Sequence, residues 1–189
     1  MNAIETHALT RRFGPRTAVD GLDLTVRQGE LFALLGVNGA GKTTTLRMLS
    51  GLLQPTSGEA DILGFRLTQQ PQEIKRRINL SPQETAVAPN LTVRENLELI
   101  AGIYGASRRE AAQRAAETIA EFHLGEVERS RAKTLSGGWQ RRLSIAMALI
   151  SQPQLVFLDE PTLGLDVLAR RELWQVIRSL RGRVTGILT

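Results

Sequence analysis

The sequence predicts an α/β fold in which a mainly parallel sheet carries an N-terminal antiparallel β flap and an inserted helical subdomain. Two observations lead to this prediction. Short apolar runs with strand character alternate with segments of helical periodicity, whereas the stretch from about Ser81 to Ala132 shows helical patterns only. Ligands of open α/β sheets bind at the carboxyl ends of the strands, so a site is expected at that edge.

The N-terminal residues read as two extended segments, about 4–13 and 18–26. The turn signal Gly14-Pro15 separates the two segments, and Gln28-Gly29 closes the second. We therefore expect an antiparallel flap ahead of the main sheet.

A phosphate-binding loop follows the first apolar run. Residues 31–35 are expected to form a buried strand, and Gly36–Thr43 fits the pattern G-x-x-x-x-G-K-S/T. Glycines allow successive N–H groups to turn toward an anion, and the next helix, expected to reach about Leu52, adds its own N–H groups and positive dipole end. This pattern predicts a P-loop NTPase core that binds a nucleoside triphosphate.

Individual residues of the loop have separate expected roles. Lys42 supplies a point charge near the β- and γ-phosphates, and the Thr43 hydroxyl is expected to hold Mg²⁺. The expected nucleotide contacts run through the loop into the helix: Gly36, Val37, Asn38, Gly39, Ala40, Gly41, Lys42, Thr43 and Thr44.

Two capping boxes identify helices in the middle of the chain. Thr92 with Glu95, and Ser107 with Glu110, each precede apolar residues at helical spacing. No strand pattern interrupts these helices, which favours a separate helical layer.

Shorter elements complete the first half of the chain. Strand-like pieces near 59–63 and 78–80 flank a basic helical patch at 71–77. We assign the whole chain to one domain, with residues 83–138 as an inserted helical subdomain and two core segments, 1–82 and 139–189.

The last third of the chain predicts a helix, a buried strand, a helix and a final strand. The first helix begins at Ser136 and faces a core with an apolar face that includes Leu143. Residues 155–158 read as a fully buried strand of a parallel sheet, followed by a helix at about 167–181 and a strand-like run at 184–188.

Two acids at the end of the buried strand predict catalytic chemistry. Asp159 can hold Mg²⁺ directly or through water, and Glu160 can polarise the water that attacks the γ-phosphate. Many strands end in two acids, but no other predicted strand of this chain does. The pair is therefore the expected partner of the phosphate loop.

A second glycine-rich helix start lies at Leu135-Ser136-Gly137-Gly138. A serine cap followed by glycines again exposes N–H groups to an anion. One domain rarely needs two such helix starts for one triphosphate. We therefore expect this one to contact a nucleotide held by another copy of the chain.

The order L-S-G-G and then L-D-E-P-T-x-G-L-D resembles the ATP-binding cassette of ABC transporters, over about Ala3 to Thr189. The stretch S-G-G-W-Q-R-R-L-S-I-A is similar to exporter cassettes of the drug, lipid and polysaccharide kind. The resemblance implies that Phe13 stacks on adenine and that Gln83 is a catalytic residue that senses Mg²⁺ and the γ-phosphate. It also implies that Asp166 contacts the opposing subunit.

The resemblance implies a function as well. It identifies an ATP-binding subunit that uses ATP and Mg²⁺, pairs head to tail with a second copy, and drives export through separate integral membrane subunits. Such a subunit lies peripherally on the cytoplasmic face of the membrane. Two departures are present: Trp139 replaces a common glutamine, and the family continues beyond Thr189 to a histidine that touches the γ-phosphate. We expect weak or absent hydrolysis by these 189 residues.

Composition leaves two alternatives open. The chain has no cysteine, which excludes thiolate metal sites, and its net charge is +5. One alternative is a soluble ABC ATPase that acts on nucleic acid, but the arginines are dispersed and only 94 residues separate Lys42 from Ser136, so no nucleic-acid partner is expected. The other is a pseudo-cassette that binds nucleotide without turnover. The transported substrate is not encoded in these residues.

Overall fold

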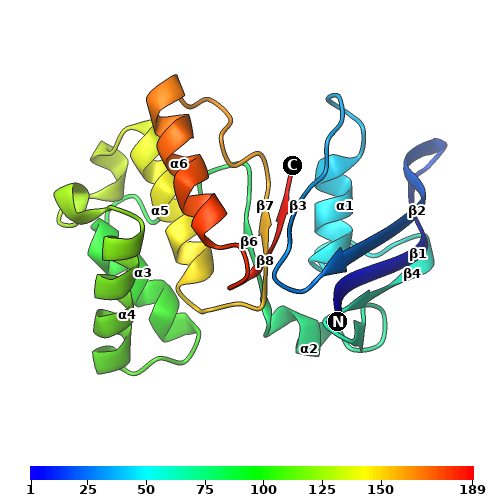
Figure 1. The fold of residues 1–189 in the computed structure, drawn as a ribbon, viewed down its shortest axis with the longest axis horizontal. Coiled ribbons are helices and arrows are strands. Elements are labelled where there is room, and N and C mark those ends of the chain that lie inside the picture. Colours follow the sequence, from blue (N-terminus) through cyan, green and yellow to red (C-terminus); the bar gives the residue numbers. More distant parts are fainter. The chain divides into compact units, whose positions relative to one another are not determined.

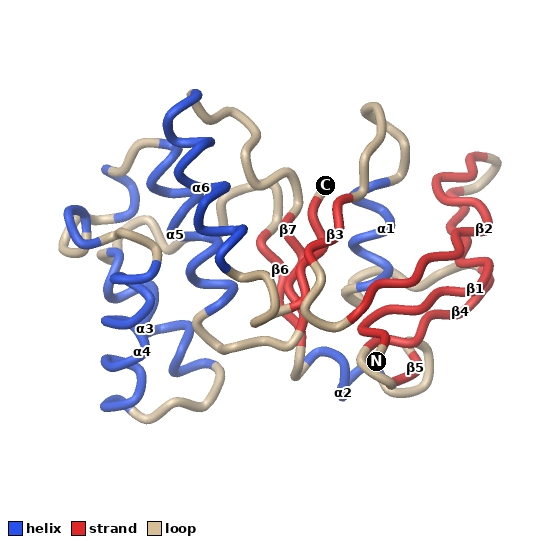
Figure 2. The backbone as a smooth tube through the Cα atoms, in the orientation of Figure 1, coloured by secondary structure: helices blue, strands red, loops and turns tan.

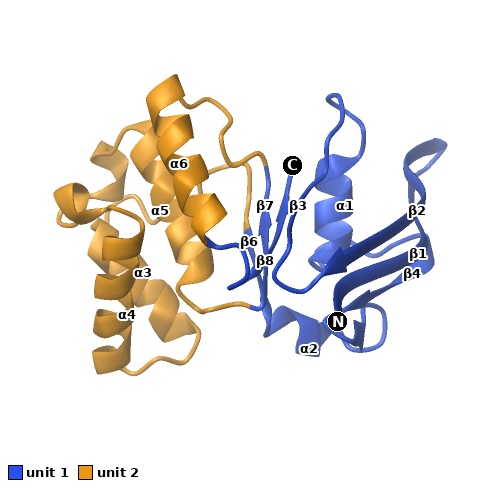
Figure 3. Ribbon diagram, in the orientation of Figure 1, with its two compact units in different colours: residues 1–80, 154–159, 180–189 blue, residues 81–153, 160–179 orange.

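The computed structural model describes all of residues 1–189, which divide into two compact units (Figure 3). Unit 1 consists of residues 1–80, 154–159 and 180–189, and unit 2 of residues 81–153 and 160–179. The chain therefore passes between the units four times, and one crossing lies between Asp159 and Glu160.

The strands and the first two helices belong to unit 1, and the later helices to unit 2 (Figure 1). The strands are β1 (Asn2–Phe13), β2 (Arg16–Arg27), β3 (Leu31–Ala33), β4 (Ser57–Ile62), β5 (Phe65–Arg66), β6 (Ile78–Ser81), β7 (Leu155–Leu158) and β8 (Thr185–Leu188). The helices are α1 (Lys42–Leu49), α2 (Pro71–Lys75), α3 (Val93–Ile103), α4 (Arg108–Glu121), α5 (Gly137–Leu149) and α6 (Val167–Ser179), with short 3₁₀ turns η1 (Gly125–Val127) and η2 (Ala132–Thr134). None of these helices is both long and apolar enough to cross a bilayer.

Unit 1 contains two four-stranded sheets (Figure 2). One has the order β2-β1-β4-β5 and antiparallel pairs, and the other has the order β3-β8-β7-β6, in which β8 pairs in parallel with both β3 and β7. Parallel pairing needs long crossover connections, which explains why neighbouring strands of the second sheet lie far apart in the sequence. The predicted fold class, including the N-terminal antiparallel flap, is confirmed.

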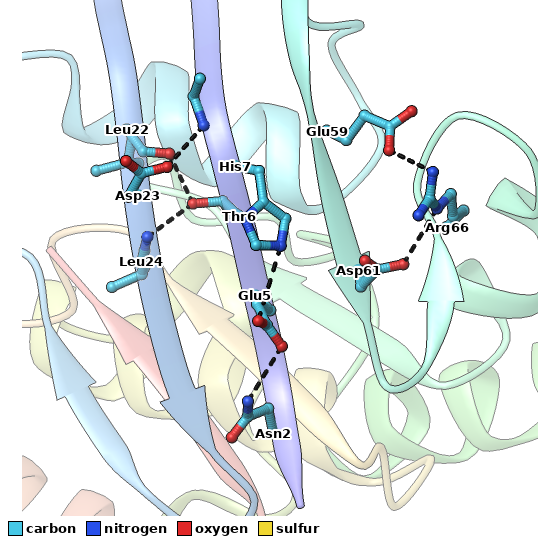
Figure 4. A network of polar contacts seen from close by, with 11 residues as sticks. Asn2, Glu5, Thr6, His7, Leu22, Asp23, Leu24, Glu59, Asp61 and Arg66 are labelled. Atoms are coloured by element: carbon cyan, nitrogen blue, oxygen red, sulfur yellow. Dashed lines mark hydrogen bonds and ion pairs between the residues drawn. The ribbon is translucent and has the colours of Figure 1, made fainter.

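Side chains hold a β-bulge in the flap. The β1–β2 register shifts between Thr6 and Leu9, where Ala8 has a φ of 48°. The Ala8 N–H donates to Asp23 Oδ1 (2.7 Å), and the Thr6 hydroxyl donates to the Leu22 carbonyl (2.7 Å) (Figure 4). These bonds replace ladder hydrogen bonds that the extra residue interrupts.

Charged side chains bridge β4 and β5 in the same sheet. Arg66 pairs with Glu59 and, at 3.7 Å, with Asp61 (Figure 4). All three side chains are substantially exposed, so these pairs contribute at most about 1 kcal/mol.

The core of unit 1 anchors the helix that follows the phosphate loop. Leu46, Met48 and Leu49 of α1 are buried, and they share one apolar cluster with residues of both sheets, including Phe157 and Ile187. Burying an aliphatic side chain of this size stabilises a fold by about 1.5–3 kcal/mol. The start of α1 is therefore fixed by packing as well as by its own backbone.

The predicted burial of residues 31–35 is wrong. Strand β3 ends at Ala33, and Leu35 is 90% exposed. Leu35 lies two residues beyond the end of β3, in the exposed stretch 35–40 that begins the phosphate loop, so no sheet covers its side chain. Helix α1 also ends at Leu49 rather than near Leu52, since Gly51 turns the chain with a φ of 70°.

Both predicted capping boxes are confirmed in unit 2. The Glu95 N–H donates to Thr92 Oγ1 (3.1 Å), and the Thr92 N–H donates to Glu95 Oε2 (2.7 Å). Ser107 and Glu110 make the same reciprocal pair at the start of α4. The hydrogen bonds from Thr92 hold the pKa of Glu95 below its usual value.

Helix α5 is more deeply buried than the sequence predicted. An amphipathic helix with one apolar face was expected, but eight consecutive residues from Arg141 to Ala148 are buried. Helices α3 and α6 both pack against α5, so it has more than one covered face. The assignment of residues 83–138 as a separate helical insertion stays a prediction.

Candidate nucleotide-binding site

The phosphate loop belongs to unit 1 and has the backbone that its glycines allow. Gly39 and Gly41 have φ values of 84° and 85°, in the left-handed region that other residues rarely adopt. Gly41 is also the N-cap of α1, and the Thr45 N–H donates to its carbonyl (2.8 Å). A Cβ at Gly41 would lie 2.3 Å from the Ala18 carbonyl oxygen of β2. Only glycine fits there without a backbone shift.

The charge of Lys42 is directed at the loop. Its ammonium donates to the carbonyls of Gly36 (2.8 Å) and Val37 (3.2 Å). Residues 36–40 are exposed, so the ammonium lies beside a loop that solvent and solutes can reach. A polyanion in the loop would exchange these neutral acceptors for charged ones, which make stronger hydrogen bonds.

A hydroxyl and a carboxylate meet beside the loop, at the carboxyl end of β7. The Thr43 hydroxyl donates to Asp159 Oδ1 over 3.2 Å, although the residues are 116 positions apart. Asp159 is 5% exposed, and the Thr189 hydroxyl also donates to Oδ1 (2.8 Å). The structure thus brings the predicted Thr43 and Asp159 together within unit 1.

The two predicted acids lie in different compact units. Asp159 is the last residue of the segment 154–159 of unit 1, which contains β7, whereas Glu160 begins the segment 160–179 of unit 2. Glu160 has a φ of 45°, a left-handed conformation that costs a non-glycine residue about 1 kcal/mol or more. The Leu163 N–H donates to the Glu160 carbonyl (3.1 Å) and closes the turn after it.

The start of α5 corrects one expectation about Ser136. The residue occupies the N-cap position with an extended backbone, but its side chain makes no capping hydrogen bond. The third helical residue is Trp139 rather than glutamate or glutamine, so no capping box can form. The first N–H groups of the helix therefore keep their capacity to bind another acceptor.

The remaining predicted site residues have defined local contacts. Phe13 at the tip of the flap is 46% exposed, and the Arg11 guanidinium lies 4.6 Å from its ring centroid. In unit 2, Asp166 Oδ1 accepts the Ala169 N–H (2.9 Å) and so caps α6, while the Gln83 side chain is exposed.

Sequence reasoning missed two buried polar residues of unit 2. Asn96 is fully buried, and its amide bonds the N–H and carbonyl of Ala88 and the carbonyl of Thr92. Arg141 is 4% exposed and donates to backbone carbonyls. A charged or amide residue is usually predicted to be exposed, and no local pattern signals the distant carbonyls that these side chains bind.

The loop backbone, Lys42 and the pair of Thr43 and Asp159 define a P-loop nucleotide-binding fold. A family model described as "ABC transporter" matches residues 19–163. The chain therefore belongs to the ABC transporter family.

Named relatives agree with this membership. The daunorubicin/doxorubicin resistance ATP-binding protein DrrA of Streptomyces peucetius is 44% identical over 98% of this chain and 56% of its own length. The probable multidrug ABC transporter ATP-binding protein YbhF of Escherichia coli is 39% identical over 94% of this chain and 31% of its own length. The chain thus spans little more than half the length of DrrA and about a third of the length of YbhF.

Solved structures show the same fold. A dimeric post-hydrolysis state of the ATP-binding cassette MJ0796, bound to ADP and Pi, superposes with a TM-score of 0.85 at 27% identity, covering 98% of this chain and 87% of that one. An ATP-binding subunit of an ABC transporter gives a TM-score of 0.83 at 32% identity, covering 98% and 78%.

Proposed function

We propose that this chain is the ATP-binding part of an ABC transporter subunit that hydrolyses ATP to drive export through separate membrane subunits. The observation that carries the proposal is the buried Asp159 carboxylate beside Thr43, next to a loop that directs Lys42. The relatives named for drug resistance and multidrug transport support the export direction over an action on nucleic acid.

ATP would bind with its phosphates in the loop from Gly36 to Thr44. Left-handed glycines and the start of α1 supply N–H donors, and Lys42 supplies positive charge. Phe13, with an exposed ring at the flap tip, is the proposed adenine contact. Stacking on adenine needs only one open face of the Phe13 ring. The Arg11 guanidinium also lies over this ring.

The residues fit Mg²⁺, which prefers oxygen ligands and commonly binds through one or two carboxylates together with substrate phosphates. Thr43 and Asp159 would hold the ion, and Gln83 is the proposed further contact that senses it. Bound Mg²⁺ would neutralise phosphate charge during transfer. Of the residues in this chain, Glu160 is the proposed group that orients the attacking water and accepts its proton.

A second copy of the chain is the proposed source of Leu135, Ser136, Gly137 and Gly138 at each nucleotide. The uncapped start of α5 supports this role, because its N–H groups and the Ser136 hydroxyl can donate hydrogen bonds to an anion. Asp166 is proposed to contact the opposing subunit. The dimeric state of the MJ0796 cassette supports the pairing. Attachment to membrane subunits would place the protein peripherally on the cytoplasmic face.

An ATP titration tests the proposal. Lys42→Ala should weaken ATP binding by at least about 100-fold, since it removes the charge directed at the β- and γ-phosphates. The matched control is Lys75→Ala, because Lys75 is exposed on α2 and should leave the affinity unchanged. Equal ATP affinity in Lys42→Ala and the parent would refute the assignment.

A further inference from the structure

Arg141 is a buried cation that makes hydrogen bonds to residues of unit 2. It sits in the second turn of α5, the helix that Ser136 begins, and is 4% exposed. A buried charge is costly unless hydrogen bonds satisfy it, so its partners are informative.

Three backbone carbonyls from two other segments accept hydrogen bonds from Arg141. Its Nε donates to the Pro161 carbonyl (3.0 Å), and its Nη1 donates to the carbonyls of Pro82 and, at 3.2 Å, Gln83. The planar guanidinium offers several donors in a fixed geometry, which suits carbonyls that approach from different directions. One side chain therefore joins α5 to the segment of Gln83 and to the residue after Glu160.

Two of the three acceptor carbonyls belong to prolines. Pro82 and Pro161 have no N–H, so the carbonyl is the only hydrogen-bonding group of each backbone unit. Glu160 has a φ of 45°, and a non-glycine residue keeps such a conformation only where its surroundings fix it. Arg141 fixes the next residue, and the Leu163 N–H binds the Glu160 carbonyl.

We propose that Arg141 is a positioning residue for hydrolysis, which fastens the backbones at Gln83 and Glu160 to the helix that Ser136 begins. The three segments then move as one piece when the start of α5 engages a nucleotide. The inference rests on the proposed roles of Gln83, Glu160 and Ser136, and Arg141 itself touches no nucleotide in it.

The neighbouring Arg142 provides a matched control. It is also buried, but its guanidinium pairs with Glu172 of α6 and lies 4.7 Å from the ring centroid of Trp139. The pair with Glu172 joins α5 to α6, the contact with Trp139 lies within α5, and neither contact reaches the segments of Gln83 or Glu160. Removing either arginine removes one buried charge from the same helix, so the comparison isolates the contacts of Arg141.

Steady-state ATPase kinetics and amide hydrogen exchange of the intact protein test the inference. Arg141→Met should lower kcat at least about tenfold with the KM for ATP changed less than about twofold, because ground-state contacts of the phosphate loop are untouched. Exchange should accelerate at residues 83–84, 160 and 162–165 but not in the phosphate loop. Arg141→Lys, which keeps the charge without the planar fork, should give an intermediate kcat, and Arg142→Met should stay within about threefold of the parent.

The outcomes separate the two proposals. A parental kcat in Arg141→Met would overturn the positioning role and leave the proposed function intact. If Arg141→Met does not fold, Arg141→Lys decides, and a parental kcat in that variant would overturn the role. A parent that binds no ATP would overturn the proposed function, and the positioning role with it.

Discussion

The helices α1 and α5 both begin at glycine-rich segments, yet the two starts are built differently. At α1 the glycines are needed for conformation, since Gly39 and Gly41 have left-handed backbones. At α5 the glycines are ordinary helical residues, and a Cβ at Gly137 would meet nothing within 4 Å. Glycine thus shapes the loop before α1, whereas at the start of α5 it leaves the N–H groups of the helix accessible.

The largest effect is expected at Gly41. Gly41→Ala should lower the free energy of unfolding by roughly 3 kcal/mol and weaken ATP binding, because its Cβ would clash with the Ala18 carbonyl and its φ is left-handed. Gly39→Ala is the control, since it shares the φ but its nearest contact is Arg16 at 4.0 Å. It should cost only about 1 kcal/mol. Equal losses in urea unfolding would show that the clash with β2 is unimportant.

A smaller effect is expected at the start of α5. Gly138→Ala places a Cβ 3.3 Å from the Ala169 Cβ of α6, whereas Gly137→Ala meets open space. Alanine is the better helix former at both positions, so the difference reports the contact alone. We expect Gly138→Ala to be about 1 kcal/mol less stable than Gly137→Ala. If the two variants were equally stable, α6 would have to shift away from the added methyl group at little cost in free energy.

The smallest effect concerns the capped helices, which contrast with the uncapped α5. The pKa of Glu95 is held below its usual value by hydrogen bonds from Thr92. A lowered pKa in the folded state gives stability that is complete above the unfolded value and is lost as the pH falls through the folded value. Stability should therefore decline below a pH of about 4.5.

The matched variant for this pH dependence is Glu95→Gln. Glutamine keeps the capping box but does not titrate, so the variant should lose less stability than the parent between about pH 5 and pH 3. Melting temperatures across that range measure the difference. Parallel curves for the two proteins would contradict the assigned cause.

Sequence predicted well the features that depend on neighbouring residues. The capping boxes of α3 and α4, the buried strand ending at Asp159 and the loop before Lys42 are all local patterns, and the structure has each of them. The features it missed depend on distant residues. Leu35 is exposed because β3 ends at Ala33, where its pairing with the distant β8 ends, and the burial of Arg141 follows from carbonyls 58 and 59 positions away.

Within the site, sequence identified residue types but not their local contacts. The side chains of Thr43 and Asp159 meet at 3.2 Å although the residues are 116 positions apart, and the metal site that they were predicted to form stays a prediction. The hydroxyl of Ser136 was expected to cap α5 and makes no capping hydrogen bond. Trp139 in the third helical position also excludes the reciprocal bond of a capping box.

The most direct test of a nucleotide shared between two copies is complementation of two variants in the Glu160→Gln background. Lys42→Ala disables the phosphate loop, and Ser136→Asp keeps a good N-cap residue while its carboxylate repels phosphate. With ATP, each variant alone should remain monomeric in sedimentation. A mixture should form dimers, because one of its two composite sites is intact. Monomers alone in the mixture, under conditions where the Glu160→Gln parent dimerises, would contradict the head-to-tail site.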